Sequence, residues 1–142
     1  MREAKSAVLK WLLVLSGVVQ ICYWGLSHLF FPEWYLRSIG MDNLAANPGE
    51  TLIFLHEIGV LAVGMGVATI LAARDPVKNF AIIIVLYIAG IGSVLTSLYH
   101  ILFGGIASGE WLTVCTITVQ MILLSVFYPW DLLRRDSQQP SR

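Results

Sequence analysis

The chain has 142 residues, of which 57% are hydrophobic and 13% are charged, and its mean hydropathy is +0.75. Soluble globular domains are about one quarter charged, so this composition excludes an ordinary soluble domain and indicates a membrane protein. The formal net charge is zero, which argues against a nucleic-acid partner, because nucleic-acid-binding proteins carry a basic surplus.

Four apolar segments are each long enough to cross a bilayer, which takes about 20 residues of helix. They lie at about 8–30, 51–73, 79–103 and 110–130, with short connections between them. The sequence therefore predicts a single domain over residues 1–142. Its fold class is all-α integral membrane, an up-down four-helix transmembrane bundle.

The first segment carries a polar stripe at steps of four residues, formed by Ser16, Gln20, Trp24 and His28. The loop that follows mixes aromatic and charged residues in "FFPEWYLRSIGMDN". Such mixtures are typical of the lipid–water boundary. We therefore expect an interfacial amphipathic segment in this first loop, and a lid over a site is the alternative interpretation.

The second segment carries the adjacent pair His56 and Glu57 five or six residues after its start and continues into two rows of small residues. One row contains Gly59 and Gly66, and a neighbouring row runs from Gly64 to Ala68 and Ala72. Small residues let membrane helices approach closely, so this helix is predicted to pack on two neighbours. His56 should lie along the first row and Glu57 along the second.

The third and fourth segments carry polar stripes of the same kind. Ser93, Ser97 and His100 lie on the third, and Thr113, Thr116 and Gln120 on the fourth. Because amide side chains deep in a membrane usually bond neighbouring helices together, Gln20 and Gln120 are predicted to have a structural role.

The orientation follows from the basic residues. Eight of the nine lie on one side of the predicted bundle and only Arg37 lies on the other. The positive-inside rule then places both termini in the cytoplasm, which is an N-in/C-in topology. The eight are Arg2, Lys5, Lys10, Arg74, Lys78, Arg134, Arg135 and Arg142.

The candidate ligand-binding residues are the three histidines and one carboxylate, which all fall within roughly 9 Å of the outer membrane boundary on three helices. Ionisable groups inside a membrane indicate a function by default. Three interpretations stay open: a structural hydrogen-bonded cluster, a site for a carbonyl compound such as a quinone, and a metal site. The residues are His28, His56, Glu57 and His100.

The stretch "HEIGVLAVGMGVATILAARDP" and the preceding "GLSHLFFPEWYLRSIGM" resemble the DoxX-like family of small four-helix bacterial membrane proteins. Within that family, "LKWLLVLSGVVQICYWGLSHLFFP" looks most like the BphX-like group. The resemblance implies a bacterial inner-membrane location and, for some members, a role beside quinone-reducing enzymes. The family residue that it carries over is Glu57.

We therefore expect a bacterial inner-membrane accessory or ligand-binding subunit with a quinone-like ligand at its outer end. The alternatives are a purely structural partner of a larger membrane complex and a metal-binding membrane protein. The partners would be the lipid bilayer and either a larger membrane redox complex or further copies of the chain. No nucleophile–base pair or established metal motif is present, so the sequence assigns no catalytic residue and does not favour an enzyme acting alone.

Overall fold

The computed structural model describes all residues except 1, 48, 105–109, 129 and 131–142. Every regular element in the described part is a helix, and no strand occurs there. The elements are α1 (Arg2–Val19), the π-helix η1 (Gln20–Leu26), α2 (Ser27–Phe30), α3 (Pro32–Ser38), α4 (Asp42–Ala46), α5 (Thr51–Ala72), α6 (Phe80–Phe103) and α7 (Glu110–Phe127).

Four helical stretches within the described residues are long and apolar enough to cross a membrane. They are Ser6–Phe30, in which α1, η1 and α2 run on continuously, Thr51–Ala72, Phe80–Phe103 and Glu110–Phe127. This confirms the prediction of an all-helical chain with four potential spans. The direction in which the termini face stays a prediction.

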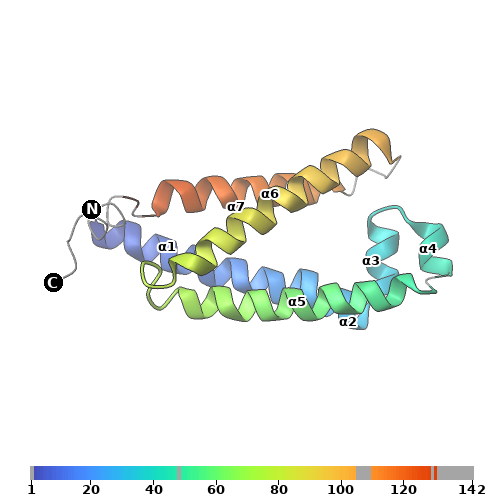
Figure 1. Ribbon diagram of the computed structural model, residues 1–142, viewed down its shortest axis with the longest axis horizontal. Coiled ribbons are helices and arrows are strands. Elements are labelled where there is room, and N and C mark those ends of the chain that lie inside the picture. The colour runs from blue at the N-terminus through green and yellow to red at the C-terminus, as the bar shows by residue number, and fades with distance from the viewer. Residues whose placement is uncertain (1, 48, 105–109, 129, 131–142) are drawn as a thin grey trace.

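The four long helices form two hairpins. The first hairpin joins α1 and η1 to α5, and the second joins α6 to α7. In Figure 1, α5 runs beside α1, whereas α6 leaves the turn after α5 and rises away from it. We call the end with that turn the termini end and the end with α3 and α4 the loop end. The hairpins are thus joined at the termini end and diverge toward the loop end.

A buried cluster holds the two hairpins together at the termini end. It takes side chains from α1, from the chain just after α5, from α6, and from α7 and the residue that follows it. Phe80 packs against the cluster, and its ring centroid lies 5.6 Å from that of Tyr128. The buried members are Leu9, Leu13, Ala73, Ile83, Leu86, Leu124 and Tyr128.

Paired glycines bring the helices of the first hairpin into backbone contact. A Cβ atom added to Gly66 would lie 2.7 Å from the carbonyl oxygen of Gly17, and one added to Gly59 would lie 3.0 Å from that of Gly25. A side chain at Gly59 or Gly66 would collide with this backbone, so glycine at these two positions permits the close approach. The predicted packing role of the Gly59–Gly66 row is confirmed. Gly64 differs, because a Cβ there would meet nothing within 4 Å.

The π-helix η1 keeps this glycine contact in register. Gly17 and Gly25 are eight residues apart, whereas Gly59 and Gly66 on α5 are seven apart, close to two α-helical turns. A π-helical turn bonds residue i to i+5 and so holds more residues than an α-turn. The extra residue in η1 lets Gly25 face α5 again.

The first loop folds into α3 and α4 at the loop end. One face of α3 is buried through Tyr35 and Leu36, which pack with Leu55 of α5, while Trp34 on the other face is 56% exposed. The segment therefore has the two-sided character that the sequence indicated. Its place at the lipid–water boundary stays a prediction.

Candidate functional site

The diverging hairpins enclose a cavity of about 450 Å³ to which all four long helices contribute. Its lining is mainly apolar, with Met65, Leu86, Met121 and Leu124 at the end nearer the termini. Five polar or amphipathic side chains interrupt this lining. They are Gln20 and Trp24 of η1, Ser93 of α6, and Thr116 and Gln120 of α7.

These five residues belong to the polar stripes of the first, third and fourth segments. The structure therefore brings the three stripes together around one space. Gln20 also approaches α5, where the hydroxyl of Thr69 donates to the carbonyl of Met65 at 2.7 Å and lies 3.5 Å from Oε1 of Gln20. Gln20 thus makes the expected contact with a neighbouring helix, but the long distance makes that contact weak. Both glutamines additionally face a cavity, which the stripes alone did not indicate.

The cavity opens sideways between α5 and α6. Leu61 lines it and is 72% exposed, and Ile58 one turn away is 48% exposed. On the opposite edge Ala89 and Ser93 of α6 both line the cavity and are exposed. In a chain that crosses a membrane, this side faces lipid. A molecule dissolved in the bilayer can therefore reach the glutamines without passing through water.

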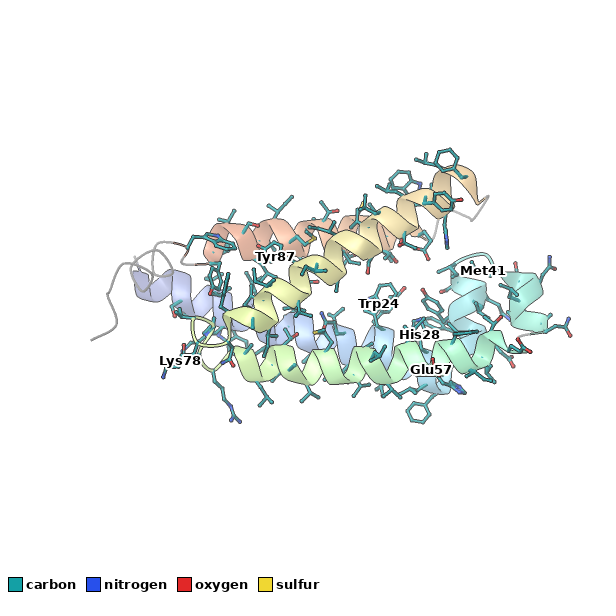
Figure 2. All side chains as sticks on the ribbon, in the orientation of Figure 1. Trp24, His28, Met41, Glu57, Lys78 and Tyr87 are labelled. Atoms are coloured by element: carbon teal, nitrogen blue, oxygen red, sulfur yellow. The ribbon has the colours of Figure 1, made fainter. Side chains whose placement is uncertain are left out.

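A buried polar cluster lies between the hairpins at the loop end (Figure 2). His28 is 2% exposed, and its Nδ1–H donates to the carbonyl oxygen of Trp24 at 2.5 Å, which leaves Nε2 as an acceptor in the neutral ring. The ring centroid of Tyr35 lies 4.0 Å from that of His28 and 6.1 Å from that of Trp24. Because Trp24 also lines the cavity, this cluster adjoins it.

The second hairpin contributes Glu110 and Ser97 to this end. Glu110 is 8% exposed, and the hydroxyl of Ser97 donates to its Oε2 at 2.7 Å. Burial raises the pKa of Tyr35, and the negative charge of Glu110 raises it further. Tyr35 on α3 therefore packs against His28 of the first hairpin and lies within electrostatic range of Glu110 of the second. The phenol stays protonated and able to donate over the whole physiological range.

The four residues proposed from the sequence do not form one group. His28 is buried in the cluster just described, His56 and His100 are half-buried, and Glu57 is exposed on α5. The expectation that Glu57 faces the bundle interior is wrong: its direction on the helix points it away from the other three helices. Among the described residues, no group of three or more His, Cys, Asp or Glu side chains could hold a metal ion.

Two residues of the site were missed from the sequence. Glu110 lies three residues before Thr113, so the polar stripe of the fourth segment could have been extended to it. Tyr35 gave no such signal, because an aromatic residue between Trp34 and Leu36 is equally typical of a membrane-surface helix.

Fold and cavity define a multi-pass helical membrane protein with a ligand-sized space between two hairpins. The chain belongs to a family of unknown function, DUF6790, whose model matches residues 1–138. No curated protein and no solved structure matches it.

Proposed function

We propose that this protein is an accessory or ligand-binding subunit of the bacterial inner membrane that takes a quinone-like molecule into the cavity between its hairpins. The observation that carries the proposal is the convergence of three polar stripes on one mainly apolar cavity with a lipid-facing opening. Cavities of about 300–1,000 Å³ with few polar groups are typical of small-molecule sites. The volume of about 450 Å³ lies within that range.

The chemistry of the lining supports a ligand with carbonyl groups on a ring. The amide N–H groups of Gln20 and Gln120 and the indole N–H of Trp24 are donors, and a quinone offers two carbonyl acceptors. The rest of the lining suits an apolar ring face. An isoprenoid-like tail would leave through the opening between Leu61 and Ala89 into lipid. A ligand of this class matches both the lining and the route of access.

The buried cluster at the loop end has a supporting role in this proposal. His28 and Tyr35 contact Trp24 and so position one wall of the cavity, and together with Glu110 they offer exchangeable protons next to it. His56, Glu57 and His100 have no place in the cavity. The proposed ligand therefore binds near mid-membrane and not beside the histidines and glutamate at the outer end.

The membrane setting rests on sequence inferences. The distribution of basic residues favours cytoplasmic termini and an outward-facing loop end, and the resemblance to DoxX-like proteins favours a bacterial inner membrane beside quinone-reducing enzymes. The second candidate, a structural partner in a larger assembly, is favoured by one observation, the exposed carboxylate of Glu57 on a helix able to span the membrane.

The test is extraction of lipids and quinones from the purified full-length protein and from a variant with Gln20→Leu and Gln120→Leu. We expect wild type to carry about one quinone per cavity and the double variant to lose at least tenfold of it, since a polar ligand left without its donors binds worse by that order. Ser125→Ala, which removes a hydroxyl outside the cavity, is the matched control. Equal quinone content in all three proteins would contradict the proposal, and a metal in place of quinone would favour the metal-binding alternative.

A further inference from the structure

One face of α5 is exposed along its whole length and has a heptad pattern. Its residues follow one another at steps of four, three, four, three and four. This is the spacing of the a and d positions along which two helices pack as a left-handed pair. All six residues are exposed, the apolar ones by 45% or more. We call this face the α5 stripe: Ile53, Glu57, Val60, Gly64, Val67 and Leu71.

One member of the α5 stripe is unsuited to contact with lipid. Glu57 lies about 9 Å along the axis from the start of α5 at Thr51, and its side chain is exposed. Carboxylates within spanning helices are rare and normally pair with another polar group. Gly64 in the middle of the stripe has open space where a Cβ would be. A glycine there leaves room for another helix backbone.

We propose that the α5 stripe is the interface of a homodimer, in which α5 packs in parallel against α5 of a second copy about a two-fold axis along the membrane normal. A second copy inserted in the same direction presents the same residues at the same depth, so the interface is self-complementary. Gly64 meets Gly64 at the centre, as paired glycines already do between α1 and α5. Val60 and Val67 pack on either side.

Charge complementarity identifies the second copy as the partner. In a parallel pair, a residue at position a is flanked by the g residue of the facing helix. Glu57 occupies position a and His56 occupies position g. The two Glu57 carboxylates face each other across the axis, and the His56 imidazole of each copy lies beside the carboxylate of the other, which offsets their repulsion. This pairing accounts for a histidine and a glutamate placed side by side, since adjacent positions on one helix point about 100° apart.

Disulfide cross-linking in native membranes tests the interface with the full chain. Cys22 and Cys115 are free and exposed, so both are first replaced by Ser. Single cysteines are then introduced as Val60→Cys, Gly64→Cys and Val67→Cys. Ile91→Cys and Leu95→Cys, on the exposed face of α6, are the matched controls. We expect oxidation to give a product of twice the chain mass at the stripe positions, at least fivefold more than at the controls.

Exchange of the charged pair tests the identity of the partner. In the Gly64→Cys background, His56→Glu puts two carboxylates together and Glu57→His puts two imidazoles together, so each should lower dimer yield about tenfold. The double exchange should restore yield to within twofold. No dimer at the stripe, a product with another mass, equal yields at the controls, or single exchanges without effect would each overturn the proposal. None of these results depends on whether the cavity binds a quinone.

Discussion

Different faces of α5 carry similar small residues but contact different parts of the molecule. On one side Gly59 and Gly66 lie within about 3 Å of the backbone of α1 and η1, measured from the positions where their Cβ atoms would be. On another side Gly64 faces open space, and between these two sides α5 borders the cavity through Leu61. The same helix thus forms a closed contact, a cavity wall and a free face.

The difference shows that the glycines of α5 bring two helix backbones together where the opposite helix also has a glycine. Gly59 and Gly66 meet Gly25 and Gly17, which the π-helix brings to the right position. Lipid chains are as apolar as the side chains of a helix, so hydrophobicity alone cannot close a contact. Toward α6, larger side chains stand opposite one another, and the helices diverge around the cavity.

The largest expected effect is at the closed side of α5. Gly66→Ala places a methyl group 2.7 Å from the carbonyl oxygen of Gly17 and 2.6 Å from a side-chain carbon of Ile21. Because the backbone cannot yield without separating the helices, the variant should lose about 1–3 kcal/mol of stability. Thermal unfolding of the purified protein in detergent measures this loss.

Gly92→Ala on α6 is the matched control, because a Cβ at that position meets nothing within 4 Å. It should be neutral or stabilising by about 0.5–1 kcal/mol, the usual preference for Ala over Gly in a helix. Equal losses at Gly66 and Gly92 would mean that α1 and α5 are not in backbone contact.

An intermediate effect is expected at the loop end, where Tyr35 is buried beside His28. Burial and the charge of Glu110 raise the pKa of Tyr35 above its ordinary value of 10.0. The folded state therefore holds this proton more tightly than the unfolded state. The resulting stability is fully present below pH ~10 and is lost as the pH rises through the higher folded pKa.

Tyr35→Phe should remove this contribution. The variant and wild type should therefore differ in the slope of melting temperature against pH only above pH ~10, with the steeper decline in wild type. The exposed Tyr99→Phe is the control for the chemical change. Parallel slopes for wild type and Tyr35→Phe would show that folding does not raise the pKa of Tyr35.

The smallest effect is expected in the turn that joins the hairpins at the termini end. The backbone N–H of Lys78 donates to Oδ1 of Asp75 at 3.2 Å, and this bond lowers the pKa of the exposed carboxylate. Asp75→Asn should lower the melting temperature slightly at pH 7. Because the folded pKa is depressed, wild type and variant should converge as the pH falls through it. A larger loss than that of Gly66→Ala would contradict this ranking.

Much of the fold could be predicted from the sequence, because helices that cross a membrane are recognised by their length and their apolar composition. The packing role of Gly59 and Gly66 and the inward direction of Gln20, Trp24 and Gln120 also followed from periodicity. These features depend on residues close together in one helix, so a helical repeat is enough to find them.

The remaining features depend on which residues of different helices face each other, and the periodicity of one helix does not contain that information. Gly64 looks like Gly66 in the sequence, and only the position of Gly17 distinguishes them. Glu57 was expected inside the bundle because a charged side chain avoids lipid. An interface with a second protein would keep the carboxylate out of lipid equally well, and the sequence of one helix does not distinguish the two cases. Tyr35 is buried beside His28 only because the first loop folds back as α3 against the first hairpin.

The central claim is that the cavity between the hairpins binds a quinone-like ligand, and fluorescence of Trp24 tests it most directly. With the other four tryptophans replaced by Phe, Trp24 remains as the single reporter on the cavity wall, and a short-chain benzoquinone is titrated into the protein in detergent. We predict saturable quenching that is lost when Ala62→Phe fills the cavity from α5. Quenching that rises without saturation and is the same in both proteins would contradict the account.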